Sequence, residues 1–314
     1  FFLQTRMKSA LLISVLISIA CIVVSADPVY VSSYLPNNYA AGQSACKTTI
    51  DWNYPSYSGY ITVNETTNSN IFFWYFPAQS GDPNAPTLLW LNGGPGFSSL
   101  FGMFNEIGPF YVSNDNFPEL LPIPYTWNKE YSLVFIDNPV GTGFSYTESD
   151  FGFSTNEKEV AENLYSAVSQ FFQLFPDLQD NDFYVCSESY GGKYNPSLSY
   201  KIWEMNQQSG TVKIPLVGLS IGDGIMDPQT QTQGIADQAY MFGMFDYNER
   251  QVGLAYEQAI YQNIVRGELV TAFEYFDEYL NGDFYQYPTF YENVTGLGSY
   301  FNFLDPVYPS NPYT

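Results

Sequence analysis

The stretch FYVCSESYGGKYNP, residues 183–196, places Ser189 between an apolar run and a segment with helical spacing. A serine on a sharp strand-to-helix turn presents its hydroxyl to a substrate, as in the nucleophile elbow G-x-S-x-G. The positions two before and two after the serine must be small because the backbones nearly touch, and here they are Ser187 and Gly191. The pattern predicts that Ser189 is a nucleophile, although a serine in a glycine-rich turn can also lack a chemical role.

A second glycine-rich turn supplies the other requirement of acyl transfer. Gly93 and Gly94 follow the apolar run Thr87–Leu91. Because glycine has no Cβ atom, backbone N–H groups in such a turn stay open to a developing oxyanion. Together with the N–H of Tyr190, this turn indicates an oxyanion hole with two donors.

The chain lacks the base that a serine nucleophile normally needs. A histidine usually takes the proton of the serine hydroxyl. The 314 residues contain no histidine. We therefore expect the chain alone to be almost inactive, because a triad without its base retains only the contributions of binding and the oxyanion hole.

The elements that position these residues alternate between strands and helices. We expect a β-hairpin within 57–76 and strands within 87–91, 133–137, 182–189 and 214–224. Helical spacing follows after residue 154, with Ser154 or Thr155 as the N-cap and an end before Pro176, and again over 190–205. Strands alternating with helices indicate an α/β domain with a mainly parallel sheet.

After about Asp227 the pattern changes to successive helical segments with no strand between them. We therefore divide the chain into three parts. Residues 1–26 are upstream residues plus a signal peptide, 27–226 are the N-terminal part of an α/β core, and 227–314 are a helical insertion.

The N-terminal segment MKSALLISVLISIACIVVSA predicts the secretory route. It has a basic start after Met7, an apolar run too short for a typical membrane span, and small residues up to Ala26. We expect cleavage after Ala26 rather than a signal anchor, and hence no membrane attachment of the mature chain. Secretion makes Asn64 and Asn293, each in an Asn-x-Thr sequence, candidate glycosylation sites.

The composition excludes several classes of function. A formal net charge of −22 disfavours binding to nucleic acid, because the protein repels phosphate backbones. With no histidine and no grouped cysteines, the sequence predicts neither a metal site nor a cofactor. After signal cleavage only Cys46 and Cys186 remain, which is too few for a disulfide framework.

Several motifs occur in the order and spacing of a known family. They are WLNGGPG at 90–96, EIGP at 106–109, DNPVGTGFSY at 137–146, ESYGGKY at 188–194 and GDGIMDP at 222–228. On these motifs the chain resembles the serine carboxypeptidases of peptidase family S10, most of all the vitellogenic-like animal branch, over about residues 57–304. The resemblance implies an α/β-hydrolase fold with a mixed, mainly parallel sheet and a helical lid insertion. It also implies that the C-terminal part of the core lies beyond this chain.

The resemblance also assigns roles to residues. It implies Ser189 as the nucleophile, Gly94 and Tyr190 as the oxyanion donors, and Asn92, Glu106 and Glu188 as the group that binds the substrate's terminal carboxylate. Two adjacent carboxyls share a proton, and the protonated pair can then donate a hydrogen bond to a carboxylate. We therefore expect tight binding of peptide C-termini at acidic pH.

Some positions depart from the commoner family pattern. Phe97 stands where many members have cysteine, Ser187 replaces a glycine, Asn195 replaces a valine and Asp223 replaces a frequent asparagine. The family's triad aspartate and histidine lie beyond the point where this chain ends. The aspartates of the insertion and tail are not candidates for the triad, and they are Asp246, Asp277 and Asp305.

The sequence thus predicts a secreted or lysosomal serine-type carboxypeptidase that acts on peptide and protein C-termini through an acyl-enzyme on Ser189. Two alternatives remain open. One is a short form that binds peptides or protein partners without cleaving them. The other is an acyltransferase on the same fold. The sequence gives no indication of the oligomeric state.

Overall fold

The computed structural model describes residues 27–48, 50, 53–113, 118–298, 300, 301 and 304. The predicted signal peptide, from Met7 to Ala26, lies outside the described residues, and so does Asp305.

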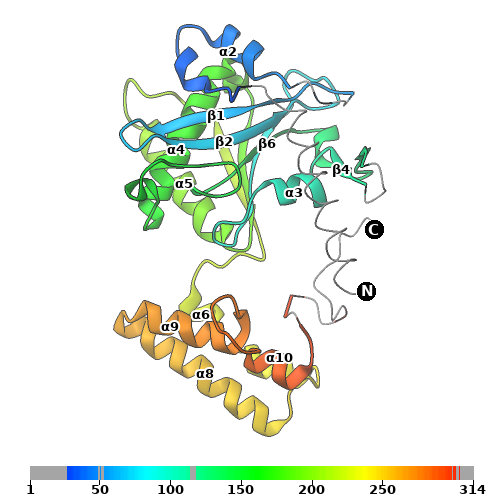
Figure 1. The fold of residues 1–314 in the computed structure, drawn as a ribbon, viewed down its shortest axis with the longest axis vertical. Coiled ribbons are helices and arrows are strands. Elements are labelled where there is room, and N and C mark those ends of the chain that lie inside the picture. The colour runs from blue at the N-terminus through cyan, green and yellow to red at the C-terminus, as the bar shows by residue number, and fades with distance from the viewer. Residues whose placement is uncertain are drawn as a thin grey trace, which may run out of the picture.

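A mixed sheet forms the centre of the molecule (Figure 1). Its strands are β1 (Tyr57–Asn64), β2 (Ser69–Phe76), β3 (Thr87–Leu91), β6 (Ser132–Ile136), β7 (Phe183–Glu188) and β8 (Leu216–Gly222). Their order in the sheet is β1-β2-β6-β3-β7-β8. The β1–β2 hairpin and the β2–β6 pair are antiparallel, whereas β6, β3, β7 and β8 run parallel. The predicted mixed, mainly parallel sheet is confirmed.

Helices and a small second sheet surround these strands. The helices of the core are η1 (Val31–Tyr34), α2 (Tyr39–Cys46), α3 (Leu100–Asn105), α4 (Glu157–Leu174) and α5 (Gly191–Asn206). The second sheet pairs β4 (Phe110–Val112) with β5 (Leu120–Pro122). Short 3-10 turns complete the core, and they are η2 (Trp127–Lys129), η3 (Asp150–Gly152) and η4 (Pro176–Asp180).

The central strands are apolar on both faces because both faces are covered. Side chains alternate along a strand. Leu89 and Leu91 of β3 therefore pack with α4 and α5 in one hydrophobic cluster, whereas Leu88 and Trp90 pack with α3 and β4 in another. This arrangement explains why the run Thr87–Leu91 carries no polar alternation, and every residue of the run is buried.

The N-cap of α4 differs from the prediction. Neither Ser154 nor Thr155 caps the helix; Asn156 does, and its side chain accepts from the Glu159 N–H at 3.1 Å. The Thr155 N–H donates to the Glu159 carboxylate at 2.7 Å instead. Asparagine, serine and threonine are all good N-caps, so their order in the sequence could not identify the one used.

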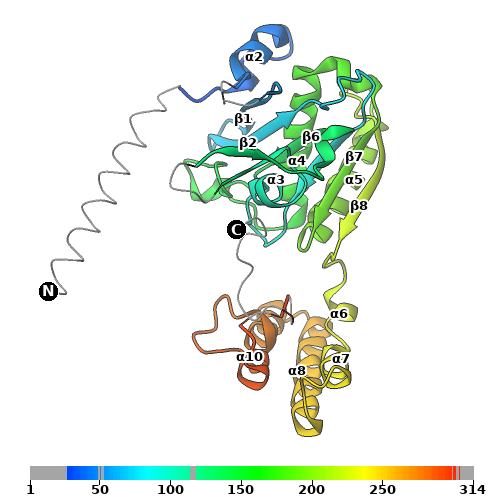
Figure 2. The same ribbon diagram turned by 90° about the vertical axis from the view of Figure 1, so that its right-hand side faces the viewer.

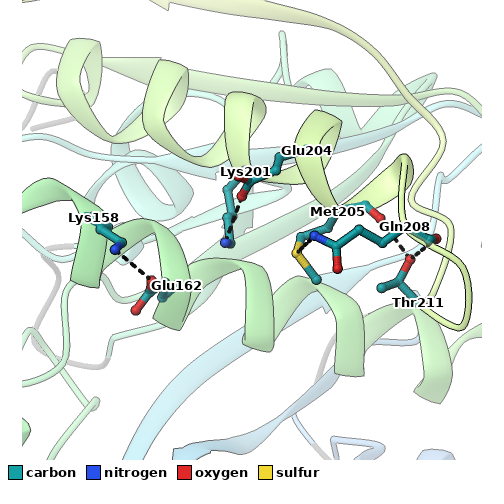
Figure 3. Close-up of polar contacts among 7 residues, drawn as sticks. All are labelled: Lys158, Glu162, Lys201, Glu204, Met205, Gln208 and Thr211. Atoms are coloured by element: carbon teal, nitrogen blue, oxygen red, sulfur yellow. Dashed lines mark hydrogen bonds and ion pairs between the residues drawn. The ribbon is translucent and has the colours of Figure 1, made fainter.

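The polar contacts on α4 and α5 are local (Figure 3). Lys158 and Glu162 of α4 are 4.0 Å apart, and Lys201 donates to Glu204 of α5 at 2.9 Å. Such exposed pairs contribute about 0.3–0.5 kcal/mol each. After the end of α5, the Thr211 hydroxyl donates to main-chain carbonyls of the preceding turn. These contacts stabilise the helices themselves and do not touch the predicted site.

The insertion forms a separate cluster of helices, reached from β8 through α6 (Figures 1 and 2). They are α6 (Pro228–Gln231), α7 (Ile235–Met241), α8 (Tyr247–Arg266), α9 (Leu269–Phe276), the π-helix η5 (Asp277–Asn281) and α10 (Phe290–Thr295). Their buried side chains, such as Ile260 and Tyr279, form a hydrophobic cluster of their own. None of the helices in the described part of the chain has the length and apolar character needed to span a bilayer.

Candidate functional site

Ser189 lies on a left-handed turn between β7 and α5. Its φ is +53°, whereas β7 ends at Glu188 and α5 begins at Gly191. A non-glycine residue rarely adopts this conformation, and such strain is found mostly at functional sites. The predicted strand–serine–helix turn is therefore confirmed, and the serine is at the carboxyl end of a parallel strand, where ligands bind in open α/β sheets.

The small residues that flank Ser189 are required by close packing. A Cβ atom on Gly191 would lie 2.5 Å from the Cβ of Ser187 and 3.1 Å from the Leu91 carbonyl oxygen. The Ser187 hydroxyl fits because it donates to the Gly191 carbonyl at 3.1 Å. The turn therefore accepts serine in place of the usual glycine at position 187.

Two departures from the family pattern are hydrogen-bond partners of each other. The Asn195 side chain is fully buried, and its Nδ2 lies 3.1 Å from the Ser187 hydroxyl. The same Nδ2 lies 2.9 Å from the carbonyls of Val185 in β7 and Ser220 in β8. Ser187 and Asn195 thus replace an apolar contact by a buried polar one, and Asn195 joins two neighbouring strands from α5.

The Gly93–Gly94 turn lies directly against the Ser189 turn. A Cβ atom on Gly93 would lie 2.8 Å from the Cβ of Ser189 and even closer to the Tyr190 nitrogen. Only glycine permits this approach. Gly94 has a φ of +109° and is exposed. Within the described residues, no protein group accepts a hydrogen bond from the N–H of Gly94 or of Tyr190. Both N–H groups are therefore free among the described residues, on two turns that pack against each other.

Asp137 holds the segment that follows the Gly93–Gly94 turn, and the sequence analysis missed it. This buried carboxyl follows β6. It accepts from the Ser98 hydroxyl at 2.6 Å, from the Ser99 N–H at 3.1 Å and from the Phe144 N–H at 2.9 Å. Its place in the motif DNPVGTGFSY was the only signal in the sequence.

Asn92, Glu106 and Glu188 lie together beside this turn, and we call them the carboxyl cluster. The Asn92 Nδ2 donates to Glu188 at 2.6 Å. The Asn92 Oδ1 accepts from the Trp90 indole at 2.8 Å and from the Gly102 N–H at 3.0 Å. These two donors fix the amide orientation, so Nδ2 must face Glu188. Glu106 follows α3 and hydrogen-bonds to Glu188.

The carboxyl cluster keeps a proton at pH values well above the usual pKa range of carboxyl groups. Burial, and then the charge of Glu188, raise the pKa of Glu106 to about 8. Burial, and then the charge of Asp223, raise the pKa of Glu188. A hydrogen bond between the two carboxyls needs a proton on one of them, so it favours the singly protonated pair. At neutral pH the pair therefore shares one proton.

Asp223 is an acidic residue of the site that the sequence analysis noted only as a departure from the family pattern. It follows β8 in the motif GDGIMDP, and its charge acts on both Glu106 and Glu188. Among the described residues, no group of three or more His, Cys, Asp or Glu side chains has a metal-binding arrangement.

The aspartates of the insertion have structural roles where the structure describes them. Asp246 is the N-cap of α8 and accepts from the N–H groups of Asn248 and Glu249. Asp277 is buried and accepts from the N–H groups of residues 283–285. Both carboxylates are thus engaged by backbone N–H groups of the insertion itself.

The predicted modification sites and thiols occupy different surroundings. Asn64 is exposed at the end of β1, and Asn293 is exposed in α10, where its Nδ2 donates to the Pro288 carbonyl at 3.0 Å. Cys46 and Cys186 are free and buried. Burial raises the pKa of Cys186 to about 11, so the thiol beside the elbow is unreactive.

Comparison with known proteins agrees with this geometry. The family model described as "Serine carboxypeptidase" matches residues 47–295. The venom serine carboxypeptidase of Apis mellifera is 47% identical over 256 residues, which are 82% of this chain and 54% of that protein. The vitellogenic carboxypeptidase of Aedes aegypti is 43% identical over 79% of this chain and 51% of its own length.

A solved structure of a carboxypeptidase has a similar fold. The crystal structure of Kex1(delta)p, a prohormone-processing carboxypeptidase from Saccharomyces cerevisiae, superimposes with a TM-score of 0.59 at 26% identity, over 70% of this chain and 53% of that one. The fold is therefore that of the α/β hydrolases, as expected. The chain spans about half the length of the curated relatives it matches. On the family model, the relatives and the fold, the chain belongs to the serine carboxypeptidase family.

Proposed function

We propose that this chain carries the nucleophile, the oxyanion hole and the carboxylate-binding part of a serine carboxypeptidase, which releases single residues from peptide C-termini. One observation carries the proposal. The Gly93–Gly94 turn packs against the strained Ser189 turn, the N–H groups of Gly94 and Tyr190 have no acceptor among the described residues, and the carboxyl cluster lies at the same edge of the sheet. A hydroxyl, two oxyanion donors and a carboxylate site are the parts that the reaction needs.

The chemistry follows from these positions. The Ser189 hydroxyl attacks the carbonyl carbon of the last peptide bond and gives its proton to a base. The N–H groups of Gly94 and Tyr190 stabilise the negative oxygen of the tetrahedral intermediate. The C–N bond then breaks, the leaving amine takes the proton, and water hydrolyses the ester on Ser189.

The carboxyl cluster would select the end of the chain. An ionised pair would repel a terminal carboxylate, but the protonated pair can donate a hydrogen bond to it. The buried Asn92 amide holds Glu188 in place for this contact. Binding is therefore strong at acidic pH and weakens as the pH rises through the pKa of Glu106, about 8.

The base would come from polypeptide outside these residues. The chain contains no histidine, and it spans about half the length of its curated relatives. We propose that a histidine and the aspartate that orients it are supplied from there. The chain by itself is then expected to be nearly inactive.

We also propose the secretory route, leading outside the cell or to the lysosome, with peptides as substrates. The signal-like segment from Met7 to Ala26 and the exposed asparagines Asn64 and Asn293 support this assignment.

A chimera tests the activity directly. Residues 7–295 of this chain would be joined to the unmatched C-terminal part of the Apis mellifera relative and expressed in insect cells. We expect release of the last residue from an N-blocked dipeptide at pH 5. Ser189→Ala should lower the rate by on the order of 10⁶-fold. The exposed Ser209, in the turn after α5, gives the control Ser209→Ala, which should be as active as the parent.

Other outcomes separate the alternatives. Transfer of an acyl group from a glucose ester to an alcohol, without dipeptide cleavage, would favour the acyltransferase. Peptide binding without any turnover would favour a binding module. Secretion with a mass that decreases after endoglycosidase treatment would support the secretory route, and retention in the cytosol would contradict it.

A further inference from the structure

The loop after β8 lies against the nucleophile turn. β7 and β8 pair in parallel register, with Glu188 opposite Gly222. The residues that follow, Ser189 and Asp223, are therefore neighbours at the carboxyl end of the sheet. Both have a positive φ, +53° for Ser189 and +38° for Asp223. Two left-handed turns thus meet at the site, which is unusual for residues other than glycine.

Hydrogen bonds join the two turns. The Ser189 N–H donates to the Gly222 carbonyl at 3.0 Å and also lies 3.4 Å from the Asp223 Oδ1. The Ser189 carbonyl accepts from the Ile225 N–H at 2.9 Å. The loop therefore holds the Ser189 peptide from both sides and fixes the Asp223 carboxyl beside the nucleophile turn.

The charged groups around this loop are mainly acidic. Asp223 follows Gly222, which lies opposite Glu188, and its charge adds to the effect of burial on both Glu188 and Glu106. From α5, Lys193 also reaches the loop, but its Nζ donates to the Met226 carbonyl at 2.6 Å. The lysine is thus held by the backbone, and three carboxyls remain together at the end of the sheet.

We propose that Asp223 is a positioning residue of the carboxyl cluster: its carboxylate places a second negative charge beside the proton-sharing pair of Glu106 and Glu188, and this charge helps to keep the proton on the pair. The inference rests on the proposed function of this site. Ionisation of the pair would place a further negative charge beside Asp223, so the pair keeps its proton to a higher pH. The site would therefore accept a peptide carboxylate up to a higher pH than the two glutamates alone would permit.

Asp223→Asn isolates the charge. Asparagine keeps an oxygen acceptor and tolerates the left-handed backbone. It also restores the residue that the commoner family pattern has at this position. Asp227→Asn is the matched control, because it removes the same charge from the same loop, where the Asp227 carboxylate accepts from the Thr230 hydroxyl at 2.6 Å. Asp223→Gly is a second variant without charge, and glycine fits a positive φ without strain.

The first measurement needs no ligand. Carboxyl ¹³C resonances of the 314-residue chain are titrated by NMR. In Asp223→Asn and Asp223→Gly, the midpoint of Glu106 should fall by about 0.5–1 pH unit. In Asp227→Asn it should stay close to that of the wild type. Equal midpoints in the wild type and both Asp223 variants would overturn the inference.

The second measurement uses N-acetyl-Phe-Leu and its C-terminal amide as probes. Wild-type protein should bind the acid more tightly than the amide at pH 5. As the pH is raised, Asp223→Asn should lose this preference at a lower pH than the wild type does. An unchanged pH dependence would contradict the role of Asp223 while leaving the proposed function intact. No preference for the acid in the wild type would instead contradict the proposed function, and the NMR titration would still decide the role of Asp223.

Discussion

Strand β3 is buried along its whole length, whereas β8, only two strands away in the same sheet, exposes much of its surface. The Val217 and Leu219 side chains of β8 are 55% and 50% exposed. In the described part of the chain β8 pairs with β7 alone, so it is an edge strand of the sheet (Figure 2). Both strands read as apolar in the sequence, so hydrophobicity alone does not give a strand's position in the sheet.

The two strands also contribute differently to the site. The loop after β3 brings the oxyanion turn and Asn92, which the resemblance assigned. The loop after β8 brings Asp223, which the resemblance left without a role. In the proposed function, the loop after β3 would supply one oxyanion donor and Asn92, and the loop after β8 would adjust the charge of the site. Each of the following predictions tests one part of this contrast.

The largest expected effect concerns packing. Leu91 of β3 is fully buried, so Leu91→Ala should lower the free energy of unfolding by about 2–5 kcal/mol. The matched change in β8, Leu219→Ala, should alter it by less than about 0.5 kcal/mol. Urea denaturation of the 314-residue chain measures both. A cost for Leu219→Ala as large as for Leu91→Ala would show that β8 is covered in solution.

A smaller effect is expected at Asn195, which links β7 to β8. Asn195→Val leaves the buried Ser187 hydroxyl without its donor, which should cost about 1–3 kcal/mol of stability. Ser187→Gly in the same chain should recover part of that cost, because it removes the hydroxyl that has lost its donor. A double-mutant cycle measures the coupling, which we expect at about 0.5–1 kcal/mol or more. Strictly additive effects would show that the two departures are independent.

The last prediction concerns a slope against pH and not a single change in stability. The pKa of Glu106 is raised from 4.5 to about 8. The free energy of unfolding should therefore fall as the pH rises through this range, because the native state keeps a proton that the unfolded state has lost. Glu106→Gln should reduce this slope, and it should also flatten the pH dependence of binding to peptide acids. The exposed Glu130 provides the control Glu130→Gln, for which both profiles should match those of the wild type. An unaltered slope in Glu106→Gln would refute the shared-proton model.

Local sequence patterns predicted most of the elements. The strand at 87–91 matches β3, and the stop before Pro176 agrees with the end of α4 at Leu174. The strand was predicted from its apolar run and the helix end from Pro176. Both signals determine local structure within a few residues. The N-cap of α4 was wrong because several adjacent side chains were chemically able to cap it.

Contacts between distant segments were not predictable in the same way. Asn195 and Ser187 were noted as two separate departures, and their hydrogen bond arises only where α5 packs on β7. Asp137 lies in a quoted motif, but nothing in the motif says that its carboxyl binds the turn at Ser98 and Ser99. Such contacts depend on strand order, which the sequence does not specify locally.

The sequence by itself determined the family, the strand–turn–helix around Ser189, the two glycines of the oxyanion turn and the absence of a histidine in this chain. These features depend on residue type and on spacing along the chain. The resemblance had also grouped Glu106 with Glu188. Only the tertiary structure added Asp223, because the parallel register of β7 and β8 places Gly222 opposite Glu188 and so brings the next residue to the same edge of the sheet. The physical reason is that a pKa depends on burial and on charges in space, and neither can be read from distance along the chain.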